Sequence, residues 1–226
     1  MLFANRKDAG RKLAAALADY CEKSPVIVAL PRGGVIVAAE IASALDAPLD
    51  LLFVQKIGVP FQPELAMGAI VDGAEPTIVR NESVIRHAGI REKEFSAICA
   101  SEQAEIERRR RCYLGDRGNI PLGARVVIVV DDGIATGSTV RAAIKAIRRQ
   151  EPKELVLAVP VAPIETLEEL DSDVDALICL ETPPVFYAVG HFFNEFPQVS
   201  DAEVIAVLAT LPQDGSPDPE PISQKE

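Results

Sequence analysis

Short runs of apolar residues, each bounded by turn-forming residues, alternate along the chain with stretches of helical periodicity. Five such runs lie at residues 26–30, 49–54, 126–130, 155–161 and 174–180. Continuous apolar runs of this length are typical of strands buried on both faces of a parallel sheet. Between them, apolar positions recur at helical spacing, as in residues 35–45 and 140–147. The alternation predicts an α/β fold with an open, mostly parallel twisted sheet flanked by helices.

Two segments depart from this alternation. Residues 68–79 read GAIVDGAEPTIV and predict a hairpin that turns at Asp72 and Gly73. A predicted helix further along has a stripe of six residues at steps of four and three, namely Phe95, Cys99, Glu102, Ile106, Arg109 and Tyr113. The two charged members of the stripe either pair with each other or face a polar pocket. The neighbouring run 108–111, four arginines beside acids, predicts a mostly solvated face.

Composition and charge narrow the class of protein. The 226 residues are 48% hydrophobic and 25% charged, which is ordinary for a globular domain and excludes wholesale disorder. A net charge of −11 makes duplex nucleic acid a poor partner, because binding phosphates of a duplex needs a basic surface. The apolar runs are far shorter than the ~20 residues that span a bilayer, and the N-terminus has no apolar segment of a secretory signal. We therefore expect a cytoplasmic protein with no membrane partner.

Neither the cysteines nor the C-terminus predicts a functional site. The chain has four cysteines, Cys21, Cys99, Cys112 and Cys179. They lack C-x-x-C spacing, which favours free thiols in a reducing compartment over a zinc or redox site. Residues 212–226 are rich in proline, serine and acids and predict a disordered acidic tail. The domain is therefore expected to span residues 1–211.

The clearest segment for chemistry follows the apolar run at 126–130. Residues 131–139 read DDGIATGST and lead into a predicted helix. They occupy the carboxyl end of a strand, where ligands bind in open parallel sheets. The glycines allow a tight turn, and the hydroxyls with the first amides of the helix can bind an anion. Two adjacent carboxylates cannot bind the same phosphate, so they suit the hydroxyls of a ribose or a magnesium ion reached through water.

The sequence VVIVVDDGIATGST resembles the ribose-5-phosphate-binding signature of type I phosphoribosyltransferases, whose common donor is phosphoribosyl pyrophosphate (PRPP). The turn Arg32-Gly33-Gly34 after the first strand is similar to the pyrophosphate loop of that family. Lys56 matches a position that contacts pyrophosphate through backbone or side chain. LPRGG, QKIGVPFQPELAMGA and AVGHFFNEFPQVSD also resemble a bacterial group of predicted phosphoribosyltransferases with no settled substrate. The resemblance spans roughly residues 1–208.

The resemblance implies a role for each matching residue. Asp131 and Asp132 would hold the ribose 2′- and 3′-hydroxyls. The ribose 5′-phosphate would be bound by the rest of the loop, with Gly133, Ala135, Thr136, Gly137, Ser138 and Thr139. Pyrophosphate would be bound by Arg32, Gly33, Gly34 and Lys56. The cofactor implied is Mg²⁺, held mainly through PRPP, with Asp131 and Asp132 as its protein ligands if any take part. The catalytic residues implied are Lys56, Arg32, Asp131 and Asp132.

The implied reaction is transfer of the phosphoribosyl group of PRPP to a nitrogen acceptor, with release of pyrophosphate. Electrostatic stabilisation of the leaving group and of an oxocarbenium-like centre would supply most of the catalysis. Such an enzyme is a glycosyltransferase of nucleotide metabolism. Hypoxanthine and guanine transferases carry an aspartate base at the position of Ala135, so alanine resembles the adenine and orotate enzymes instead. The partners implied are PRPP and a small-molecule acceptor, and a homodimer is left open.

A small C-terminal hood, roughly residues 182–205, is where this fold would cover the acceptor. Phe186 and Tyr187 are its candidates to stack on a nucleobase, and the alternative is that such aromatics pack the hood onto the sheet. The alternative function is a non-catalytic regulator that senses PRPP or a nucleotide on the same fold. A phosphorelay receiver is excluded because its acid pair lies on the first strand. A Rossmann domain is excluded because no G-x-G-x-x-G loop follows the first strand.

Overall fold

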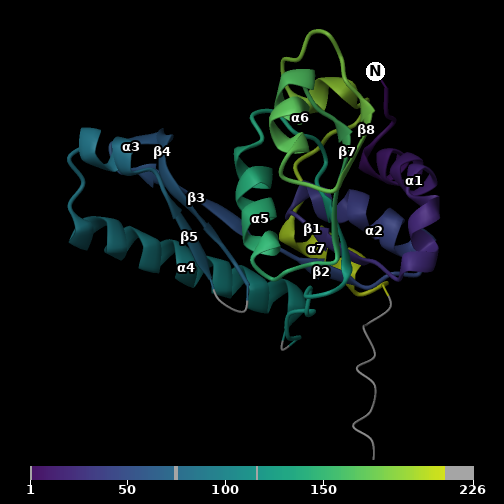
Figure 1. Ribbon diagram of the computed structural model, residues 1–226, viewed down its shortest axis with the longest axis horizontal. Coiled ribbons are helices and arrows are strands. Elements are labelled where there is room, and N and C mark those ends of the chain that lie inside the picture. Colours follow the sequence, from purple (N-terminus) through teal and green to yellow (C-terminus); the bar gives the residue numbers. More distant parts are fainter. Residues whose placement is uncertain (1, 74–75, 116, 212–226) are drawn as a thin grey trace, which may run out of the picture.

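The computed structural model describes residues 2–73, 76–115 and 117–211. The chain forms two sheets, a five-stranded parallel sheet in the order β2-β1-β6-β7-β8 and a three-stranded antiparallel sheet in the order β3-β4-β5. In Figure 1 the small sheet projects with two helices to one side of the parallel sheet. The predicted tail, residues 212–226, lies outside the described residues. None of the helices in the described ranges is both long and apolar enough to cross a membrane.

The apolar runs of the sequence form the parallel sheet, which confirms the predicted α/β class. Its strands are β1 (Val26–Ala29), β2 (Leu49–Leu51), β6 (Val126–Val130), β7 (Glu154–Val161) and β8 (Ala176–Glu181). All residues of β1 and β6 are buried, as expected of strands covered on both faces. Ile128 of β6 pairs with Ile27 on one side and with Val156 on the other, so the three central strands are in parallel register.

Helices cover both faces of the parallel sheet, and each face has its own core. Helices α1 (Arg6–Ala16) and α2 (Gly33–Leu45) pack on the face that carries Ile128, and α7 (Asp201–Leu208) joins them. Helices α5 (Ser138–Arg148) and α6 (Ile164–Asp171) pack on the face that carries Val127 and Val129. Successive residues of β6 therefore serve opposite cores, as the period of two in a strand requires. A short 3-10 helix, η1 (Ala18–Lys23), follows α1.

Residues 54–114 form an arm beside the parallel sheet. The arm comprises β3 (Val54–Val59), β4 (Gln62–Val71), β5 (Thr77–Arg80), α3 (Glu82–His87) and α4 (Glu92–Leu114). The predicted hairpin is confirmed, since Gly68 pairs with Arg80 and Val71 with Thr77. The predicted strand 49–54 is wrong at its end: β2 stops at Leu51, and the polar residues that follow belong to β3, which pairs with β4 instead.

The stripe predicted for the long helix is confirmed by α4, with one correction. Phe95, Cys99, Ile106 and Tyr113 are buried along it. Glu102 and Arg109 do not pair with each other, because the Nε atom of Arg109 donates to Glu105 at 2.7 Å. The run 108–111 is not uniformly solvated either, since the side chain of Arg110 is only 17% exposed.

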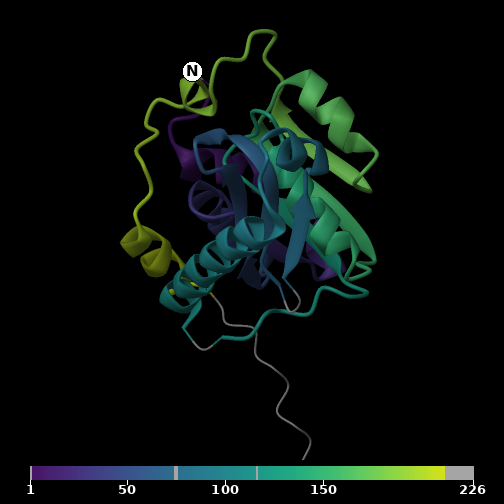
Figure 2. The same ribbon diagram turned by 90° about the vertical axis from the view of Figure 1, so that its left-hand side faces the viewer.

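The hood contains no strand over its described residues 182–200 and is held by a small apolar core of its own. Phe193 packs at 5.2 Å between ring centres on Phe3, and the amide nitrogens of residues 2 and 3 donate to the carbonyl oxygen of Phe192. This part holds η2 (Val189–Phe192), and the chain then runs along the side of the molecule to α7 (Figure 2). The N-terminal residues thus complete the hood, which the sequence pattern did not predict.

Candidate active site

The loop of residues 131–137 connects β6 to α5 at the carboxyl edge of the parallel sheet. Gly133 has a φ angle of +151° and Gly137 one of +70°, backbone conformations that favour glycine. Ile134 is the buried point of the loop, and its amide donates to the carbonyl oxygen of Val161. The hydroxyl-bearing residues 136, 138 and 139 are exposed at the start of α5, whose N-cap has no side-chain hydrogen bond. The first amides of α5 are therefore available to an anion.

Asp131 and Asp132 directly follow β6 and are electrostatically coupled. The Oδ1 atom of Asp131 accepts a hydrogen bond from the Asp132 amide at 2.8 Å. Burial raises the pKa of Asp131 well above its ordinary value, and the neighbouring charge of Asp132 raises it further. Burial also raises the pKa of Asp132, but there the hydrogen bond and charge of Arg6 oppose the effect. Perturbed carboxyl pairs of this kind cluster at functional sites.

The turn Arg32-Gly33-Gly34 packs directly against the acid pair. A Cβ atom on Gly33 would overlap the carboxylate of Asp132, and one on Gly34 would lie 2.9 Å from the carbonyl oxygen of Val130. The peptide bond between Pro31 and Arg32 is cis. Both glycines are thus required for close approach of the β1–α2 turn to the end of β6. The structure brings together the groups that the sequence assigned separately to pyrophosphate and to ribose.

Lys56 lies on β3 of the arm and reaches the site from the other side. It lines a cavity of about 470 Å³ together with Val54 and with Thr136, Ser138 and Thr139 of the α5 loop. The residues lining this cavity do not include the turn at Arg32. The structure therefore places Lys56 opposite the predicted phosphate loop, at the junction between the arm and the parallel sheet.

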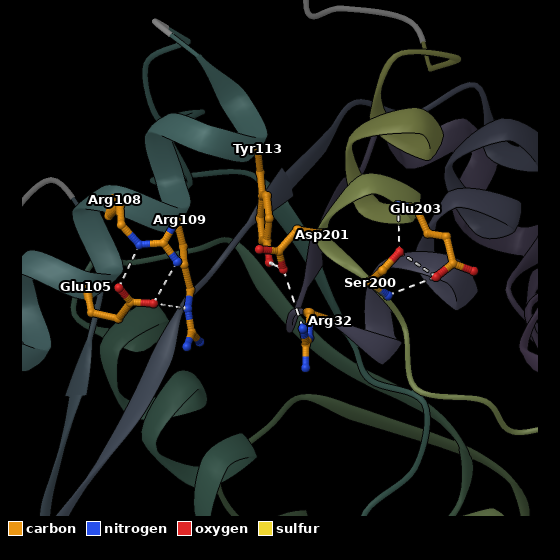
Figure 3. A network of polar contacts seen from close by, with 8 residues as sticks. All are labelled: Arg32, Glu105, Arg108, Arg109, Tyr113, Ser200, Asp201 and Glu203. Atoms are coloured by element: carbon orange, nitrogen blue, oxygen red, sulfur yellow. Dashed lines mark hydrogen bonds and ion pairs between the residues drawn. The ribbon is translucent and has the colours of Figure 1, made fainter.

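Arg32 is linked to two helices through Asp201, as Figure 3 shows. Its Nη1 atom is 3.4 Å from Oδ1 of Asp201, and the same oxygen accepts a hydrogen bond of 2.6 Å from the hydroxyl of Tyr113. Burial and the contact with Asp201 raise the pKa of Tyr113 to about 12, so the phenol remains a donor at neutral pH. The same hydrogen bond, with Arg32 adding, lowers the pKa of Asp201.

Sequence reasoning missed three residues of this region, which are Arg6, Tyr113 and Asp201. Arg6 begins α1 and forms an ion pair of 2.6 Å with Asp132, from which it is separated by 126 residues. Tyr113 was noted only as part of an apolar stripe. Partners this far apart are set by the topology, and a single sequence carries no local signal for them.

The two acceptor candidates have different surroundings. Phe186 packs at 5.1 Å between ring centres on Phe192 within the core of the hood, the second of the two roles considered for it. Tyr187 is 80% exposed and lies 5.9 Å from the ring of His191, so its role toward an acceptor stays a prediction.

The described residues offer little to a metal ion beyond the acid pair itself. All four cysteines are free, as the sequence predicted. Nowhere in the described ranges do three histidine, cysteine or acidic side chains come together as a set that could hold a metal ion. A divalent cation would thus need ligands from a bound substrate.

Comparison with known proteins gives concordant findings. Residues 2–192 match the family model of the phosphoribosyl transferase domain. Two proteins of Mycobacterium tuberculosis, from strains H37Rv and CDC 1551, bear provisional phosphoribosyl transferase names and are 44% identical over 207 residues, which is 92% of this chain and 46% of each relative. The chain thus spans about half the length of these curated relatives. The crystal structure of TT1426 from Thermus thermophilus has 36% identity and a TM-score of 0.77, and covers 92% of this chain and 98% of that one.

Proposed function

Because the chain belongs to the phosphoribosyl transferase domain family, we propose that it transfers the phosphoribosyl group of PRPP to a nitrogen acceptor and releases pyrophosphate. The observation that carries the proposal is the packing of Arg32-Gly33-Gly34 against Asp131 and Asp132. A cation-bearing turn and an acid pair then meet at one sheet edge. Displacement at the anomeric carbon needs this neighbourhood, since the ribose and its leaving pyrophosphate must be held together.

Each part of the loop has a role in this proposal. The α5 amides and the hydroxyls of Thr136, Ser138 and Thr139 bind the 5′-phosphate, because a helix N-terminus with unused donors favours an anion. Asp131 and Asp132 accept hydrogen bonds from the ribose hydroxyls. Ala135 offers no carboxylate, so this loop supplies no base to a nucleobase acceptor.

Arg32 and Lys56 supply positive charge from opposite sides of the site. Arg32 keeps most of its five donors for a ligand, because its contact with Asp201 is long at 3.4 Å and its side chain is 40% exposed. Negative charge grows on the departing pyrophosphate in the transition state, where fixed cations stabilise it most. We assign Arg32 to the pyrophosphate, and Lys56 to the phosphates that face the arm across the cavity.

Magnesium fits the donor chemistry of the site. Carboxylate oxygens are ligands that Mg²⁺ prefers, and it commonly binds through one or two carboxylates together with substrate phosphates and water. Asp131 and Asp132 are the residues that would hold it, directly or through water. When bound with PRPP, the ion would neutralise part of the pyrophosphate charge.

The test is pyrophosphate release from PRPP and Mg²⁺ over a panel of nucleobases and small amines. The expected result is release with at least one acceptor, and a loss of ~10²-fold in kcat and kcat/KM for Arg32→Ala and Lys56→Ala. Lys153→Ala is the matched control, because Lys153 is exposed just before β7, at the opposite edge of the sheet. Tight PRPP binding with no release from any acceptor would contradict the transferase and favour the regulator.

A further inference from the structure

A buried arginine from the first helix lies against one of the two aspartates of the site. The Arg6 side chain is 10% exposed and is held at three points. Nε donates to Oδ2 of Asp132 at 2.6 Å, and Nη1 donates to the carbonyl oxygen of Pro197 at 2.8 Å. The guanidinium carbon lies 3.6 Å from the ring centre of Phe196. The cation is therefore fixed by α1, the hood segment and the acid pair together.

The contact leaves part of the Asp132 carboxylate for a ligand. Its Oδ2 atom accepts from Arg6 and lies against Gly33, where any Cβ atom would overlap it. An ionised carboxylate has about four lone-pair positions on its two oxygens. Oδ1 can thus accept hydrogen bonds from hydroxyl groups while Oδ2 holds the orientation of the carboxylate.

Burial by itself would favour a protonated Asp132. The pKa of this carboxyl is raised by burial, and Arg6 is the largest influence that opposes the rise. A protonated carboxyl has one donor and fewer acceptor positions, so it suits two ribose hydroxyls less well. A guanidinium is charged at every pH at which the protein is folded.

We propose that Arg6 is a positioning residue of the ribose site, which keeps the Asp132 carboxylate ionised and turned so that it accepts hydrogen bonds from ribose hydroxyls. The inference rests on the proposed function, because it takes the sugar of PRPP as the ligand of the acid pair. It predicts that Arg6 sets the preference for ribose over 2-deoxyribose. If Arg6 only tied α1 to the hood segment, its loss would weaken all sugar phosphates alike.

The experiment compares dissociation constants, by calorimetry, for ribose 5-phosphate, 2-deoxyribose 5-phosphate and inorganic phosphate. Wild type should prefer ribose 5-phosphate about tenfold, the worth of one hydrogen bond to a charged group. In Arg6→Lys and Arg6→Met the ratio should fall to roughly twofold or less, because the deoxy sugar has no hydrogen bond to lose. Affinity for inorganic phosphate should be unchanged, since the α5 loop binds it, and it reports at the same time that the variant is folded.

Arg11→Lys and Arg11→Met are matched controls on the same helix. Arg11 is 62% exposed, and its ion-pair partner Glu40 is 3.8 Å away. Both controls should keep the wild-type ratio. A full preference for ribose in folded Arg6 variants, or a wild type that binds both sugars equally, would overturn the inference alone. A wild type that binds no sugar phosphate and no PRPP would overturn the proposed function and the inference with it.

Discussion

Asp131 and Asp132 have the same chemistry and adjacent positions, but different partners. Asp131 accepts a backbone hydrogen bond, which an asparagine oxygen can also accept. Asp132 neutralises the buried guanidinium of Arg6, which no neutral side chain can do. The two charges should therefore have opposite effects on stability.

Asp131→Asn should raise the Tm at neutral pH, because it removes a buried charge that burial and Asp132 both disfavour. A carboxyl with a raised folded pKa destabilises the protein fully above that pKa, and not at all below the ordinary value. The gain should thus shrink as the pH falls toward 4. Thermal unfolding between pH 4 and pH 8 measures it, and a constant difference across this range would contradict the raised pKa.

Asp132→Asn should instead destabilise the protein by about 3 kcal/mol, because it leaves Arg6 buried without its counter-ion. For a chain of this size, that free energy corresponds to a fall of about 6–12 °C in Tm. The same thermal unfolding experiment provides the comparison. Equal Tm values for the two asparagine variants would show that Arg6 does not distinguish the two carboxylates.

At the scale of elements, the arm is joined to the parallel sheet by a buried charge cluster. Nη1 of Arg110 on α4 is 2.8 Å from Oδ2 of Asp72, which follows β4. Its Nη2 is 3.8 Å from Oδ1 of Asp50, which lies on β2. Asp50 also accepts hydrogen bonds from the amides of Leu51 and Ile120. Both sheets thus share one cation.

Arg110→Met should destabilise the protein by about 3 kcal/mol, because two carboxylates that are each 10% exposed lose their cation. Arg111→Met, one residue further along α4 and exposed, is the control and should change the Tm by less than ~2 °C. The measurement is thermal and denaturant unfolding at neutral pH. The same loss in both variants would mean that helix propensity, rather than the cluster, is responsible.

What could be predicted from the sequence was local. The apolar run 126–130 and the loop after it were predicted correctly because strand burial, turn glycines and helix start all lie within one short segment. Arg110 was assigned to a solvated face because its neighbours in the chain are charged, whereas its partners come from β2 and the end of β4. Lys56 was placed at the end of a parallel strand because nothing local shows that the chain changes sheets after Leu51.

At the scale of the whole molecule, an acidic chain concentrates a few cations around one edge of its sheet. The net charge is −11, yet Arg6, Arg32 and Lys56 all lie at or beside the acid pair and the α5 loop. Each comes from a different element, so the site forms only when the N-terminus, the β1–α2 turn and the arm are in place. We expect a donor that carries several phosphates and a diol to match this edge better than any simple anion.

Binding of PRPP with Mg²⁺, followed by the shift in Tm, tests the central claim most directly. A ligand that binds only the folded protein stabilises it by about 2.7 kcal/mol at 100 times its Kd, which is a shift of about 5–11 °C for this chain. The account predicts such a shift for wild type, and a much smaller one for Asp131→Asn and Asp132→Asn. No shift with PRPP, ribose 5-phosphate or any nucleoside monophosphate, or an equal shift in both aspartate variants, would contradict it.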